Sequence, residues 1–169
     1  MGAAALAATL LVAGCLGSAR PPDPAQMAAE TGRLEQVLPL LEELGVTRFT
    51  AEDGCTWIIY ARGRFFDGGE SCQPGGAGPF DDAARADHAR LLEAIEAAGA
   101  PTRRMLNATI GSDGRLGTAL FLHSAHPFPG YWTYLYDPGN VEPKVEGGRL
   151  EVKHTRVNAG WWFVSSLDD

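Results

Sequence analysis

Two histidines close together in the chain have the types and spacing that most readily suggest chemistry. His123 and His126 are separated by two small residues, and prolines follow at 127 and 129. Two imidazoles can bind a transition metal when a carboxylate joins them. Residues three apart on a strand point to opposite faces, however, and the prolines indicate a loop. We therefore expect a structural loop and assign no metal, cofactor or catalytic residue. A metal-dependent or hydrolytic enzyme using His123 and His126 is the alternative.

No motif of covalent catalysis accompanies these histidines. Ser124 lies between them, but the chain contains neither a GxSxG nor an SxxK pattern. His88 falls on the apolar side of a predicted helix, which is typical of a core histidine. The sequence therefore favours a non-enzymatic protein.

The N-terminal segment carries the one motif that indicates location. An apolar run over residues 4–14 ends in Val12-Ala13-Gly14-Cys15, and it is too short to span a bilayer. This segment resembles a bacterial lipoprotein signal peptide with its lipobox. The resemblance implies cleavage before Cys15, lipidation of that thiol, and anchoring on the extracytoplasmic side of the cell membrane. An ordinary secretory signal is the alternative. We divide the chain into a signal peptide (1–14), a lipidated tether (15–24) and one globular domain (25–169).

The remaining cysteines agree with that compartment. If Cys15 carries lipid, only Cys55 and Cys72 are left. Thiols in an oxidising envelope tend to pair, so we expect a Cys55–Cys72 disulfide. Two free thiols are the alternative.

Large aromatic rings alternate along two predicted strands near the C-terminus. Along residues 131–136 the rings of Trp132 and Tyr134 share one face, and Trp161 and Trp162 must point to opposite faces. Some of these rings should therefore avoid the helix-covered core, where they could stack on a ligand. We select Trp132, Tyr134 and Trp162 as ligand-binding candidates. Ordinary core packing is the alternative.

Composition limits the possible partners. The 169 residues carry a net charge of −7 and are 45% hydrophobic. This balance argues against nucleic acid, which requires clustered Lys and Arg, and against electrostatic attachment to anionic lipids. We expect a lipid-anchored envelope protein, a non-enzymatic binding or docking module for a protein partner or for a glycan or lipid ligand.

Two helices are predicted. The first covers 24–44, with Pro39 kinking or dividing it and Gly45 ending it. The second is capped by Asp81 or Asp82 and runs to about residue 98.

Strands should make up most of the rest. Alternation and turn residues predict them over 54–61, 104–110, 116–123, 131–136, 150–155 and 161–164. Helices grouped largely ahead of strands indicate an α+β fold. We expect a mainly antiparallel sheet of about five to six strands packed against two helices, with one disulfide. A curled half-barrel is the alternative.

Overall fold

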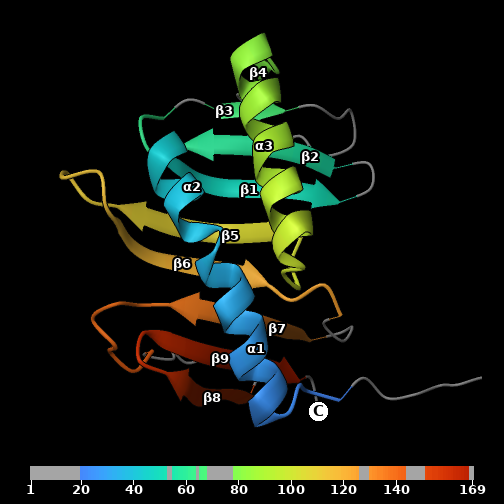
Figure 1. Ribbon diagram of the computed structural model, residues 1–169, viewed down its shortest axis with the longest axis vertical. Coiled ribbons are helices and arrows are strands. Elements are labelled where there is room, and N and C mark those ends of the chain that lie inside the picture. Colours follow the sequence, from blue (N-terminus) through green and yellow to red (C-terminus); the bar gives the residue numbers. More distant parts are fainter. Residues whose placement is uncertain are drawn as a thin grey trace, which may run out of the picture.

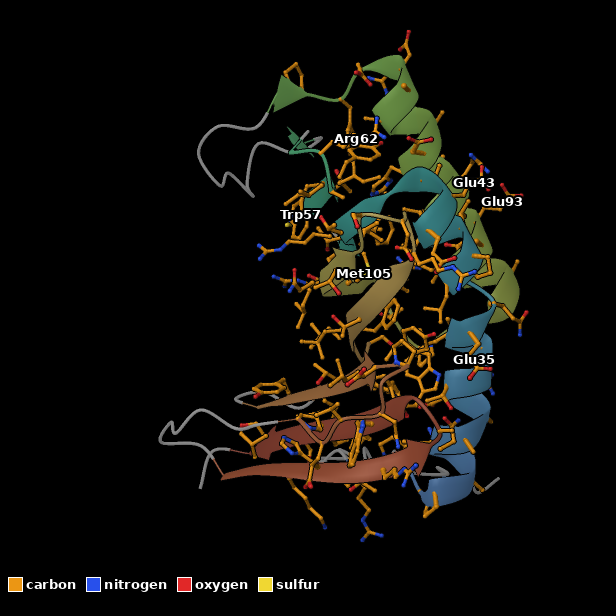
Figure 2. The ribbon with its side chains drawn as sticks, turned by 90° about the vertical axis from the view of Figure 1, so that its left-hand side faces the viewer. Glu35, Glu43, Trp57, Arg62, Glu93 and Met105 are labelled. Atoms are coloured by element: carbon orange, nitrogen blue, oxygen red, sulfur yellow. The ribbon has the colours of Figure 1, made fainter. Side chains whose placement is uncertain are left out.

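One β-sheet runs the length of the molecule, and the helices lie on one side of it (Figures 1 and 2). The computed structural model describes residues 20–52, 55–63, 65–67, 78–125, 130–143 and 151–167. Within these residues the strand order is β4-β3-β2-β1-β5-β6-β7-β9-β8. Every neighbouring pair is antiparallel except β3 and β4, which pair in parallel. The predicted α+β class with a mainly antiparallel sheet is therefore confirmed.

The sheet has more strands than the five to six predicted. Its described strands are β1 (Val46–Glu52), β2 (Cys55–Tyr60), β3 (Phe65–Asp67), β4 (Gly78–Pro79), β5 (Arg104–Ile110), β6 (Leu116–Leu122), β7 (Tyr131–Tyr136), β8 (Glu151–Asn158) and β9 (Trp161–Leu167). The six predicted strands correspond to β2 and to β5 through β9. The structure adds β1, β3 and β4.

The sequence analysis did not predict β1, and the structure gives a physical reason. A register shift between Val46 and Arg48 interrupts its alternation, and its buried side chains do not follow a period of two. Thr50 is fully buried in this strand although it is polar. The strands β3 and β4, with three and two residues, are too short to produce a periodic signal.

The first predicted helix is divided, as Pro39 indicated. It forms α1 (Pro24–Glu35) and α2 (Leu38–Leu44), with Pro39 in the first turn of the second piece. Proline is tolerated there because the amide groups of a first turn have no helical partner. Gly45 ends α2 with a φ of 65°, a left-handed conformation that glycine adopts without a Cβ clash.

The second predicted helix is confirmed as α3 (Asp82–Ala98). Asp81 is its N-cap and accepts a hydrogen bond from the backbone N–H of Ala84 at 2.7 Å. The cap satisfies one of the amides that the first helical turn leaves unpaired. In Figure 1, α3 and α2 lie over the β2-to-β5 half of the sheet, and α1 lies over the β7-to-β8 half.

The main core fills the space between the helices and this side of the sheet. Its fully buried members include Leu34, Val37 and Leu91 from the helices and Phe49, Ile58, Met105 and Phe121 from the sheet. Register pairs Ile58 with Phe49, Phe49 with Met105, and Met105 with Phe121. One continuous apolar row therefore crosses the sheet beneath the helices.

Several sequence predictions fall on residues outside the described ranges. Cys15, Cys72 and His126 belong to this group, as do the predicted signal peptide and the first half of the predicted tether. Cys55 begins β2 and does not carry a free thiol. Its pairing with Cys72 stays a prediction.

Candidate functional site

A buried polar cluster joins α1 to the sheet. Glu30 of α1, His123 after β6 and Tyr134 of β7 are each at most 5% exposed. The Tyr134 hydroxyl donates to Glu30 Oε2 at 2.5 Å, and His123 Nε2 lies 3.3 Å from the same oxygen. Gln26 donates from Nε2 to Glu30 Oε1 at 2.8 Å. Both carboxylate oxygens therefore have donors close to them, as a buried charge requires.

The hydrogen bonding of His123 indicates its protonation. Its Nδ1 accepts the backbone N–H of Ala125 at 3.0 Å, so Nδ1 carries no proton in this geometry. In a neutral imidazole the ring proton then sits on Nε2, the nitrogen that lies 3.3 Å from Glu30 Oε2. This ring packs in the core against Trp132 and Tyr134, at centroid distances of 5.8 and 6.0 Å.

The cluster resembles an anchor for α1 more than a reaction centre. Burial, and then the hydrogen bond to Glu30, raise the pKa of the Tyr134 phenol far above its usual range. Because this phenol stays protonated, its O–H remains able to donate a hydrogen bond to Glu30. Among the described residues, no group of three His, Cys, Asp or Glu side chains could hold a metal ion.

His88 is a core histidine, as its position on the apolar side of α3 predicted. Its Nε2 lies 2.9 Å from the Thr50 carbonyl oxygen. Its ring packs against Phe49 and Phe80, at centroid distances of 4.8 and 5.4 Å. The ring therefore serves packing between α3 and β1.

The aromatic ligand-binding candidates are not exposed. Trp132 and Tyr134 are 3% and 0% exposed and lie beneath α1, in ring contact with Phe163. The expectation that these two rings avoid the helix-covered core is wrong, because α1 lies over the part of the sheet that carries them. Trp162 is 9% exposed and points the other way, since its neighbour Trp161 donates from Nε1 to Glu35 of α1.

The side of the sheet that faces away from the helices has its own rows of side chains, which we call the helix-free face. Register and alternation place two rows there. The first row runs Trp57, Thr50, Arg104, Leu122, Thr133, Val164, His154. The second contains Ile59, Arg48, Leu120, Leu135, Trp162, Arg156. Figure 2 shows Trp57 on the side opposite the helices.

Charge differs between the two sides of the molecule. The two rows contain three arginines, at 48, 104 and 156, and Glu52 of β1 is the nearest acid to Arg104, with Oε2 at 3.4 Å from Nη1. Figure 2 shows Glu35, Glu43 and Glu93 on the helix side. Register also pairs Asp67 with Trp57, so among the described residues this face carries three arginines and two acids, in a chain of net charge −7.

This face also carries buried polar atoms without hydrogen-bond partners. Thr50 Oγ1, Arg104 Nε, Trp162 Nε1 and Ser166 Oγ are all buried and unpaired in the part of the chain that the structure describes. All four side chains belong to the helix-free face, Ser166 because it lies two residues from Val164. A buried unpaired group costs about 1–3 kcal/mol, so four on one face require an explanation.

Two hollows on the opposite side accompany α2. One, of about 530 Å³, is lined by Glu35, Pro39, Glu42 and Tyr136 among others, and the other, of about 660 Å³, shares Glu42. The two glutamates that line the first are already engaged, Glu35 with the Trp161 indole and Glu42 with the Leu116 amide. They therefore stabilise the packing of the helices on the sheet.

Comparisons with known proteins add no relative. No family model, no curated protein and no solved structure matches this chain. Within the described residues, none of the helices has the length and apolar character needed to cross a membrane.

The sequence contained part of the signal for the helix-free face. The strand predicted over 150–155 corresponds to β8, but its alternation alone does not show which of its sides meets the core. Register pairs Thr155 with Phe163 of the core and His154 with Val164 of the opposite face. Only the strand order reveals that Arg104, Trp162 and Arg156 share one surface.

Proposed function

We propose that this protein is a lipid-anchored, extracytoplasmic and non-enzymatic binding module, and that a small envelope ligand binds on its helix-free face. Anchoring through Cys15 is the part of the proposal that rests on the N-terminal motif. Binding rests on one observation: Trp162 lies on the helix-free face beside Arg156 in the strand register, and Arg156 is exposed.

The side chains of this face resemble those of a small-molecule binding surface more than those of a surface that contacts only water. Trp162 and Val164 are nearly buried there, and Leu122 is 8% exposed. Binding surfaces for small molecules combine mostly apolar area with a few fixed polar groups. Trp162 is the ligand-binding candidate retained from the sequence, because its ring lies on this face between Leu135 and Arg156 in the strand register.

The alternative enzyme has less support. It needs His123 available beside position 126, and the His123 ring instead packs against Glu30, Trp132 and Tyr134. No observation on the described residues favours a metal-dependent or hydrolytic reaction.

Native mass spectrometry tests the proposal. The full chain carrying Cys15→Ser would be exported and purified from its own host's envelope. We expect a retained non-covalent mass, since the ligand is drawn from that compartment. A bare mass from folded protein would overturn the small-ligand proposal and redirect the search to protein partners.

Neighbouring tryptophans provide matched variants for this measurement. Trp162→Phe removes the unpaired N–H of the helix-free face but keeps an aromatic ring. Trp161→Phe makes the same change on the helix side, where the N–H pairs with Glu35 at 2.9 Å. The retained mass should fall in Trp162→Phe and persist in Trp161→Phe. Equal retention in both variants would contradict binding at the helix-free face.

A further inference from the structure

The hollow of about 530 Å³ on the helix side lies where α1 and α2 meet two turns of the sheet. One of these turns follows β7, and the other joins β8 to β9. The apolar part of the lining is made by Leu38, Pro39, Tyr136, Pro138 and Ala159. Both prolines are exposed and Tyr136 is half-buried, so an incoming side chain can reach this surface.

The turn after β7 borders the hollow and presents an exposed apolar side chain. Among the described residues, Val141 is the one large hydrophobic residue that is exposed, at 62%. Asp137 holds the turn by accepting the backbone N–H groups of Gly139 at 2.9 Å and Val141 at 3.1 Å. A turn held in this way can contact a partner with little loss of conformational entropy.

The hollow and this turn are acidic. Their carboxylates are Glu35, Glu42, Asp137 and Glu142. Within the described residues, none of these four forms an ion pair, and the lining contains neither Lys nor Arg. Arg115 precedes the Leu116 amide that Glu42 accepts, so one arginine stands against four acids. A cation would therefore be attracted to this site.

The two glutamates of the lining each keep one carboxylate oxygen for a partner. Glu35 uses Oε1 to accept the Trp161 indole N–H at 2.9 Å, and Glu42 uses Oε1 to accept the Leu116 amide at 2.8 Å. Within the described residues neither Oε2 has a hydrogen-bond partner, and both side chains are exposed. The bonds to Oε1 fix the position of each carboxylate, and Oε2 can accept from a guanidinium or an ammonium group.

Tyr136 adds an aromatic ring to the same hollow. Its ring packs against Trp161 at a centroid distance of 5.2 Å, which fixes its orientation. Burial raises the pKa of the Tyr136 phenol, and the charges of Glu42, Glu35 and Asp137 raise it further. A cation over the face of a tyrosine ring is attracted to it. The ring and the carboxylates therefore favour the same kind of group.

We infer that this hollow is a docking site for a basic segment of a protein partner, with an arginine or lysine side chain beside Glu35 and Glu42 and an apolar neighbour against Val141. Charge complementarity selects the cation. The exposed Val141 outside the hollow favours a chain segment over a small amine, which would occupy the hollow alone. The site is separate from the helix-free face, because Glu35 lies on the side of the sheet opposite Trp57 (Figure 2).

Titration with defined probes, followed by two-dimensional N–H NMR, tests the partner class. The Cys15→Ser protein would be titrated with the blocked peptide Gly-Leu-Arg-Leu-Gly, with the same peptide carrying Gln in place of Arg, and with N-acetylarginine amide. We expect saturable shifts of the amides of residues 136–141 and 159–160 with the arginine peptide. The other two probes should bind roughly five- to tenfold more weakly, because each lacks either the charge or the apolar contacts.

Each other result of this titration overturns part of the proposal. Equal binding of the glutamine peptide would overturn the selection of a cation. Equal binding of N-acetylarginine amide would overturn the chain segment in favour of a small cation. No shifts with the arginine peptide, or shifts confined to other parts of the molecule, would overturn the site itself.

Glutamine variants separate the charge of the site from its structural role. Glu35→Gln and Glu42→Gln each remove a charge but keep Oε1 as the acceptor, so circular dichroism should show an unchanged fold. Each should weaken binding of the arginine peptide by roughly three- to fivefold. Glu93→Gln removes the same charge from α3, elsewhere on the helix side (Figure 2), and should leave binding unchanged. Equal effects of all three variants would show that only net charge matters and would overturn the site.

Val141→Ser tests the apolar contact. The backbone bond to Asp137 does not involve the replaced side chain, so the unfolding midpoint should not change. Binding of the arginine peptide should weaken by roughly threefold, the effect of losing about one buried methyl group, and binding of N-acetylarginine amide should stay the same. Unchanged binding of the peptide would overturn the chain segment as the occupant.

Discussion

At the scale of single residues, the buried carboxylate of Glu30 is the most consequential group in the core. Its oxygens lie close to the Tyr134 hydroxyl, His123 Nε2 and the Gln26 amide. A buried charge is tolerated only when its hydrogen-bonding capacity is met. These contacts therefore determine whether α1 can pack on β7.

Removing one donor from this cluster should be costly. We expect Tyr134→Phe to lower the free energy of unfolding by about 1.5–3 kcal/mol, because it takes a hydrogen bond from a buried carboxylate. Urea denaturation followed by circular dichroism would measure the change. Tyr131→Phe, on the opposite face of the same strand, is the control and should cost less than about 0.5 kcal/mol. A loss below 1 kcal/mol in Tyr134→Phe would show that the hydroxyl does not support Glu30.

The raised pKa of Tyr134 gives a pH dependence with a defined sign. In the unfolded chain this phenol ionises near pH 10, whereas in the folded protein burial keeps it protonated. The folded state then holds a proton that the unfolded state releases, so its contribution to stability is present below about pH 10 and is lost as the pH rises further.

Alkaline denaturation checks this sign. The free energy of unfolding should fall above pH 10 more steeply in the wild-type protein than in Tyr134→Phe, which has no phenol at this position. Thermal melts between pH 8 and 11 would measure both slopes. Identical slopes would mean that Tyr134 does not contribute to the loss of stability at alkaline pH.

At the scale of elements, the helix ends follow from local residue chemistry. Asp23 and Asp81 accept hydrogen bonds from backbone amides of the first turn. Gly45 and Gly99 have φ values of 65° and 61° at the C-caps. These requirements involve only a few neighbouring residues, which is why the start of α1, the end of α2 and both limits of α3 could be predicted from the sequence.

Two glycines should respond to alanine with opposite signs. Gly45→Ala has open space for a Cβ but a φ of 65°, so it should lower stability by about 1–2 kcal/mol. Gly32→Ala lies within α1, also with nothing within 4 Å, and should raise stability by about 0.5–1 kcal/mol. Chemical denaturation of both variants measures the difference. A stabilising Gly45→Ala would contradict the left-handed cap at the end of α2.

At the scale of the whole molecule, the sheet separates two chemically different sides. The helices lie on one side with Glu35, Glu43 and Glu93, and Trp57 lies on the other (Figure 2). The strand register places Arg48, Arg104 and Arg156 on the same face as Trp57. This separation allows one side to supply the stability of the fold. The other side is where we propose that the ligand binds.

The proposed anchor makes a prediction at the same scale. In the native host, the wild-type protein should fractionate with membranes, and Cys15→Ser should move to the soluble envelope fraction, because acyl chains supply the membrane affinity. Cell fractionation with immunoblotting measures the distribution. A soluble distribution of the wild-type protein would favour the ordinary secretory signal. Membrane retention of Cys15→Ser would indicate attachment by another route.

The sequence by itself determined the helices, their ends, the break near Pro39 and six strands. Each of these depends on local patterns such as caps, turn residues and alternation. Strand β1 was not predicted, because its register shift breaks that alternation.

Only the tertiary structure decided which side of each strand is covered. Alternation shows that Trp161 and Trp162 point apart, but the position of α1 makes Trp161 a core residue and leaves Trp162 on the helix-free face. The same packing buried Trp132 and Tyr134, and it brought Glu30 to His123, 93 positions away in the chain. The physical reason is that burial depends on contacts between segments far apart in the sequence, and local residue patterns do not encode which segments meet.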